Sequence, residues 1–190
     1  IQEDTEKFNI LYQNTVRIFT IGVALICMVI FYYSDLIINI LYGDKWIASV
    51  IYLQLLIVAS FFYLQEMFNR IIFKIFDKTE KILQLEVFKK AIQSLTIFYG
   101  IWTMSIENLL YGFVLISVIS FLVNYYFARK VQGCFYWMDF VDVIKVVVVC
   151  ICIVVFCEFL ANKYRIIGLE NLWMLPIMLS MYICMLHLFC

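Results

Sequence analysis

Residues 109–130 read LLYGFVLISVISFLVNYYFARK, a run of twenty mostly apolar residues that ends at Arg129 and Lys130. An α-helix needs about 20 such residues to cross the hydrocarbon core of a bilayer. Because that core offers no water to the backbone, each N–H and C=O must be satisfied within the segment, which favours a helix over an open strand. This stretch therefore predicts a membrane-spanning helix with a basic end.

Composition extends this prediction to the whole chain of 190 residues. Hydrophobic residues make up 66% of it and charged residues only 15%. Soluble domains are about half apolar and a quarter charged. The formal net charge of zero provides no basic surface for nucleic acid, so no nucleic-acid partner is expected.

Five further apolar stretches of similar length accompany the first. We expect six transmembrane helices in an all-α, polytopic membrane protein. Roughly, they cover residues 15–33, 47–68, 83–104, 109–128, 141–161 and 169–189.

The basic residues are distributed unevenly between the two sides of these spans. With the N-terminus in the cytoplasm, eleven of the fourteen lie on or face the inner side, as the positive-inside rule requires. Both termini are therefore predicted to be cytoplasmic. The inner set is Lys7, Arg17, Arg70, Lys74, Lys78, Lys81, Lys89, Lys90, Arg129, Lys130 and Lys145, and the outer set is Lys45, Lys163 and Arg165.

The connections between spans make further predictions. Residues 34–46 indicate a short external helix that ends at Gly43. The very short link 104–109 predicts an antiparallel hairpin of the third and fourth spans. Pro176 could kink the last span, and residues 162–171, with Gly168, form a mixed-charge outer turn.

A polar cluster at the end of the second span carries the candidate site. Glu66, Asn69 and Arg70 share one helix face, and Lys74 continues it toward the cytoplasm. One interpretation is a Glu66–Arg70 ion pair that fixes the depth of the helix. The other is a polar stripe that lines a water-filled cavity, where an arginine fork suits a phosphate or pyrophosphate.

Other polar residues give weaker signals. Asn124 precedes Tyr125, Tyr126 and Arg129, a pattern typical of an aromatic belt at the membrane interface. Lys89 is expected to contact anionic headgroups. The seven cysteines show no CxxC spacing and are interpreted as small hydrophobic residues, and His187 has no partner nearby in sequence. No catalytic residue, cofactor or metal site is predicted.

Four motifs in series carry a family resemblance. They are QEDTEKFNILYQNTVR at 2–17, LYGDKW at 41–46, LQLEVFKK at 83–90 and YGFVLISVISFLVNYYFARKVQG at 111–133. Their order resembles the C-terminal part of Wzx-like flippases for O-antigen and polysaccharide, within the multidrug, oligosaccharidyl-lipid and polysaccharide exporter superfamily. The resemblance covers residues 1–133, and residues 134–190 match only in length and hydrophobicity.

The resemblance implies a two-lobed helical bundle around a central cavity, of which this chain would be the C-terminal six helices, partnered by an N-terminal lobe. It also implies transport of an undecaprenyl-pyrophosphate-linked oligosaccharide across the bacterial inner membrane by alternating access, without covalent chemistry. Membrane lipids and the lipid-linked oligosaccharide would be its partners. Glu66, Asn69, Arg70 and Lys74 would face the cavity if the second span lines it.

Two other functions stay open. One is a small-molecule or multidrug exporter of the same superfamily. The other is a membrane glycan polymerase or acyltransferase, against which the short outer connections argue. The chain also departs from the family where glycine is usual, with Asp77 after the second span and Ser105 before the fourth, so different turn geometry is expected there.

Overall fold

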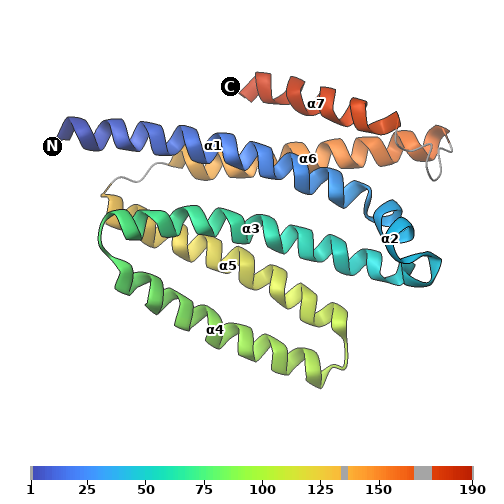
Figure 1. Ribbon diagram of the computed structural model, residues 1–190, viewed down its shortest axis with the longest axis horizontal. Coiled ribbons are helices and arrows are strands. Elements are labelled where there is room, and N and C mark those ends of the chain that lie inside the picture. Colours follow the sequence, from blue (N-terminus) through green and yellow to red (C-terminus); the bar gives the residue numbers. More distant parts are fainter. Residues whose placement is uncertain (1, 134–136, 165–172, 190) are drawn as a thin grey trace. The chain divides into compact units, whose positions relative to one another are not determined.

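The computed structural model describes residues 2–133, 137–164 and 173–189, and within them the chain is all-α (Figure 1). Seven α-helices and one 3-10 helix make up this part of the chain. In order they are α1 (Gln2–Tyr32), α2 (Ser34–Tyr42), η1 (Asp44–Ser49), α3 (Val50–Ile75), α4 (Thr79–Trp102), α5 (Ile106–Gln132), α6 (Trp137–Tyr164) and α7 (Met174–Phe189).

Four of these helical segments are long and apolar enough to cross a membrane, as a multi-pass membrane protein requires. The two remaining predicted spans differ for separate reasons. Helix α4 has sufficient length but carries Glu86, Lys89 and Lys90, which make it less apolar. The apolar part of α7 is shorter, and residues 169–172 of that predicted span lie outside the described residues. The four apolar segments are Asn9–Tyr32, Asp44–Ile75, Ile106–Gln132 and Phe140–Lys163.

The helices group into two compact units, and the first contains α1, α2, α6 and α7. Its buried core joins side chains of α1, α6 and α7, and includes Met28, Ile153 and Met178. The Tyr182 hydroxyl donates a hydrogen bond of 2.7 Å to the Ile21 carbonyl, which ties α7 to α1. Buried hydroxyls need such partners in an apolar interior.

The charged residues and helix ends of this unit agree only in part with the predictions from the sequence. Arg17 of α1 lies 3.7 Å from the Asp142 carboxylate of α6. The short helix predicted after the first span is confirmed as α2, which ends at Gly43 with a φ of +80°, while its external position stays a prediction. Pro176 is the third residue of α7. Because the first four N–H groups of a helix have no intrahelical acceptor, the expected kink is not required there.

The second unit contains α3, α4 and α5. Helix α5 packs extensively against α3 and also against α4, whereas α3 and α4 contact each other less. Helices α4 and α5 form the predicted antiparallel hairpin, drawn in green and yellow in Figure 1. A Cβ on Gly112 of α5 would lie 2.0 Å from Cγ2 of Thr96 in α4, so glycine is required for this close approach.

The two turns at which the resemblance predicts glycine have different backbone conformations. Asp77 adopts a left-handed φ of +51°, a conformation that aspartate tolerates better than most residues. Ser105 is extended at φ −123°, and the left-handed residue is Met104 instead. The Ser105 hydroxyl accepts a hydrogen bond of 3.3 Å from the N–H of Asn108, so serine serves as the N-cap of α5.

Candidate functional site

Glu66 is a carboxylate in the interior of the α3–α4–α5 unit, with only 1% of its surface exposed. It lies nine residues before Ile75, the end of α3. At 1.5 Å per residue, that places it about 14 Å along the helix from its end. Because α3 is long and apolar enough to span a bilayer, a lone charge on its buried face would be costly, and Glu66 needs partners.

Three side chains from three helices satisfy this carboxylate. Oε2 accepts a hydrogen bond of 2.6 Å from Nζ of Lys89 in α4. Oε1 accepts one of 3.1 Å from Nδ2 of Asn124 in α5, and it also pairs with Arg70 one turn along α3. Glu66 therefore joins all three helices at one level.

Arg70 extends the cluster toward the surface, because it also pairs with Glu86 of α4. We call Glu66, Arg70, Glu86, Lys89 and Asn124 the ion network. Its two carboxylates balance its two cations. The exposed fraction of the side chain rises from 1% at Glu66 through 12% at Lys89 and 20% at Arg70 to 29% at Glu86. The network thus leads from the interior of the unit to its surface.

An aromatic ring accompanies the two cations. Nζ of Lys89 lies 4.8 Å from the centroid of the Tyr63 ring, and Cζ of Arg70 lies 6.0 Å from it. A cation over a ring face is attracted to the negative face of the ring. Tyr63 is one turn before Glu66 on the same face of α3, so it provides a second favourable site for each cation beside the carboxylate.

The four residues predicted from the sequence have separate environments. Glu66 and Arg70 form the ion pair expected from their spacing. Asn69 is buried, but its side chain donates to the Gln65 carbonyl at 3.3 Å rather than to the network. Lys74 is exposed and pairs with no carboxylate among the described residues.

Spacing along one helix does not predict Glu86, Lys89 and Asn124 as members of the network. Lys89 was predicted to contact headgroups and Asn124 to lie in an interfacial belt. Lys89 lies ten residues into α4 and Asn124 eight residues before the end of α5. Glu66 is at a comparable distance from the end of α3. The predicted hairpin, together with these distances from the helix ends, therefore places Glu66, Lys89 and Asn124 at one level.

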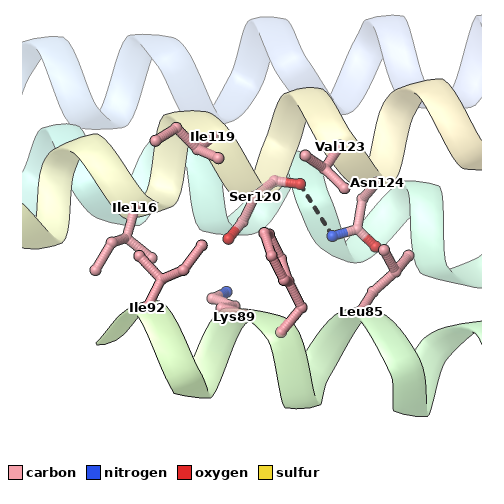
Figure 2. Close-up of a pocket in the computed structure, with 9 residues that line it drawn as sticks. Leu85, Lys89, Ile92, Ile116, Ile119, Ser120, Val123 and Asn124 are labelled. Carbon is pink, nitrogen blue, oxygen red and sulfur yellow. Dashed lines mark hydrogen bonds between the residues drawn. The ribbon is translucent and has the colours of Figure 1, made fainter. Parts of the chain in front are cut away.

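A shallow groove lies beside the network, between α4 and α5 (Figure 2). Its free volume is about 10 Å³. Three polar residues line it, Lys89, Ser120 and Asn124, and we call this polar part of the lining its floor. The rest of the lining is apolar and consists of Leu85, Phe88, Ile92, Ile116, Ile119 and Val123.

Residues with metal-binding chemistry do not gather elsewhere in the described part of the chain. It contains no group of three or more His, Cys, Asp or Glu side chains placed to hold a metal ion. Of the cysteines, Cys157 is buried as expected, whereas Cys152 and Cys184 are exposed on their helices. Cys134, Cys190, Gly168 and the side chain of His187 lie outside the described residues.

Comparisons with known proteins give no further assignment of this site. A scan against protein-family models, a search of curated proteins and a search of solved structures each found no match to this chain.

Proposed function

We propose that this chain is part of a membrane flippase that moves a lipid-linked oligosaccharide between the two leaflets by alternating access. The proposal places it in a bacterial inner membrane with both ends of the stretch cytoplasmic, as the distribution of basic residues favours. A lobe supplied by further sequence would complete the cavity. The series of motifs at 2–133 and the ion network support this proposal.

The observation that carries it is the buried ion network that joins α3, α4 and α5. Ionisable side chains within membrane helices are rare, and they mark substrate or ion pathways because an unpaired charge there is costly. Here three polar side chains from three helices meet around the buried Glu66 carboxylate, and Glu86 joins them through Arg70. A single pair would suffice to fix the depth of α3, so the extension through Lys89 and Glu86 favours a transport role.

The chemistry of the network suits exchange with a pyrophosphate. A carboxylate presents two oxygens to Arg70 and Lys89, as a phosphate does, and a guanidinium can bond two oxygens of either group. An arriving pyrophosphate would replace Glu66 or Glu86 as the partner of these cations. The Glu66 and Glu86 carboxylates would hold Arg70 and Lys89 in place when no substrate is bound.

Helix α4 is the element that such an exchange would release. Gly100 is its only buried residue, and its contacts with α3 are few. The two ion pairs to α3, Lys89 to Glu66 and Glu86 to Arg70, therefore hold a helix that buries little else. Breaking them would free the charged half of α4, while the close packing at Gly112 retains the other half.

The test compares two adjacent lysines of α4. Lys89 pairs with Glu66, whereas Lys90 is exposed and bonds only Gln93 on its own helix, at 3.1 Å. In a bacterial strain that lacks this gene, the protein with Lys90→Ala should restore surface glycan to the wild-type level. Lys89→Ala should lower export roughly tenfold at equal membrane abundance, as expected from losing a charge-assisted hydrogen bond of about 1.5–3 kcal/mol.

Two results would contradict the proposal. Normal export by Lys89→Ala together with Arg70→Ala would remove the network from the transport path. Surface glycan that is unaffected by deletion of the gene would exclude glycan export. Extrusion of small cations from membrane vesicles would then favour the multidrug exporter.

A further inference from the structure

The groove between α4 and α5 has a polar floor that the ion network does not fully use. Ser120 and Asn124 line it from α5 and Lys89 from α4. Figure 2 shows the Ser120 hydroxyl pointing from α5 toward α4, the helix that carries Lys89. Ser120 is 7% exposed and Asn124 is 4% exposed, so both are more than nine-tenths buried.

The Ser120 hydroxyl differs from other hydroxyls in these two helices. Ser94 donates to the carbonyl of Lys90 at 2.9 Å, and Ser117 donates to that of Phe113 at 2.9 Å, each four residues earlier. This bond is the usual arrangement for serine within a membrane helix. The Ser120 hydroxyl makes no such bond, nor one to any other residue that the structure describes.

The Asn124 side chain uses its amide nitrogen in hydrogen bonds but not its amide oxygen, within the described part of the chain. Its Nδ2 donates to Oε1 of Glu66 at 3.1 Å and to the Ser120 carbonyl at 2.9 Å. Its Oδ1 accepts no hydrogen bond within the described part of the chain. The groove floor thus offers a hydroxyl and an amide oxygen beside an ammonium group. Neither oxygen is among the fully buried atoms without a partner in the described part of the chain, so both are accessible to a small polar group from the groove.

The size of the groove limits what this partner can be. A free volume of about 10 Å³ is near the minimum for one water molecule, and a bound water typically makes about three hydrogen bonds. The floor presents three polar groups in this space. A molecule that is only apolar would fill the volume but leave the two oxygens unsatisfied.

We propose that the floor of the α4–α5 groove is a binding site for one small hydroxyl-bearing group, hydrogen-bonded by Ser120, Asn124 and Lys89. Two sources could supply this chemistry, a solvent water or a sugar hydroxyl of the carried glycan. The water source does not depend on the proposed function, whereas the glycan source rests on it. In both cases the site connects aqueous solution to the ion network and gives Lys89 a polar neighbour when it leaves Glu66.

The first test is the reactivity of a cysteine at the floor. Ser120→Cys in the intact protein, in membrane vesicles, should react with a charged, water-soluble methanethiosulfonate reagent several-fold faster than Leu122→Cys. Leu122 is the matched control because it is exposed on α5 at 42% but does not line the groove. Mass spectrometry of the peptide with residue 120 or 122 distinguishes this reaction from that of the seven native cysteines.

The outcomes separate the two sources. Labelling of Ser120→Cys that is unchanged by the purified lipid-linked oligosaccharide assigns the site to water. Labelling that the oligosaccharide suppresses assigns it to a sugar hydroxyl. Equal labelling of the two cysteines in membranes, with full labelling of both after denaturation, would overturn the proposal.

A second measurement needs no substitution at the site. Hydroxyl radicals generated in the sample oxidise side chains beside accessible or bound water, so Phe88, which lines the groove, should be oxidised several-fold faster than Phe98. Phe98 is the matched residue about three turns further along α4, and it is exposed at 68% compared with 53% for Phe88. Equal or slower oxidation of Phe88 would overturn the proposal even if Ser120→Cys does not fold.

Discussion

Nζ of Lys89 lies 2.6 Å from Oε2 of Glu66, and this ion pair links α4 to α3 across 23 residues of sequence. Both partners are largely removed from solvent, with 12% and 1% of the side chain exposed. Taking two charges out of water costs several kcal/mol per ion, which the attraction between them offsets only when the geometry is good. The pair is therefore sensitive to the loss of either partner.

A double-mutant cycle tests this relationship. Lys89→Met alone removes one of the two cations beside Glu66, and we expect the free energy of unfolding to fall by about 3–5 kcal/mol. Adding Glu66→Gln to Lys89→Met should recover a large part of the loss, because a neutral amide no longer requires a cation. Unfolding in mild detergent measures the free energy of unfolding of both variants. Additive losses in the double variant would contradict direct coupling between the residues.

The close approach of α4 and α5 makes the second prediction. Gly112→Ala places a methyl group 2.0 Å from Cγ2 of Thr96, so the helices must separate. We expect a loss of about 1–3 kcal/mol from overpacking, despite the higher helix propensity of alanine. Thermal unfolding in detergent measures the change. Gly22→Ala is the matched control in α1, because a Cβ there meets no atom within 4 Å. An unchanged melting temperature for Gly112→Ala would contradict the packing.

The contact at Gly112 also shows how much of the fold the sequence predicts. The length of residues 104–109 predicts the α4–α5 hairpin, because so short a link leaves no other arrangement. The sequence does not identify Gly112 as the contact point, since a glycine within an apolar run is equally compatible with exposure to lipid. Contacts of this kind depend on the rotation of each helix about its axis, which tertiary packing determines.

The candidate site, like the hairpin, is predicted only in part by the sequence. Spacing along one helix predicts the Glu66–Arg70 pair, because residues four apart are neighbours on a helix surface. The contribution of Lys89 and Asn124 depends on which faces of α4 and α5 turn toward α3. Lysine near the end of a span is as compatible with headgroups as with a buried carboxylate, so its residue type alone could not distinguish them.

The strained turn after α3 makes the third prediction. Asp77 has a φ of +51°, which glycine adopts without a steric cost. Asp77→Gly should therefore stabilise the protein by about 0.5–1 kcal/mol, since relief of the left-handed conformation outweighs the added backbone freedom of the unfolded chain. Thermal unfolding provides the measurement. Lys78→Gly is the control, because its φ of −110° is already favourable and the change should destabilise. A fall in stability with Asp77→Gly would refute the strain.

The last prediction concerns the orientation of the spans across the membrane. With the N-terminus in the cytoplasm, the turn after α2 at Lys45 lies outside and the turn after α3 at Lys78 lies inside. A single cysteine introduced at Lys45 should react with an impermeant maleimide in intact cells. One introduced at Lys78 should react only after the membrane is opened. The reverse pattern would invert the topology and place the Lys74 end of α3 outside. Reaction of both cysteines in intact cells would mean that α3 does not cross the membrane, and the ion network would lose its place within the bilayer.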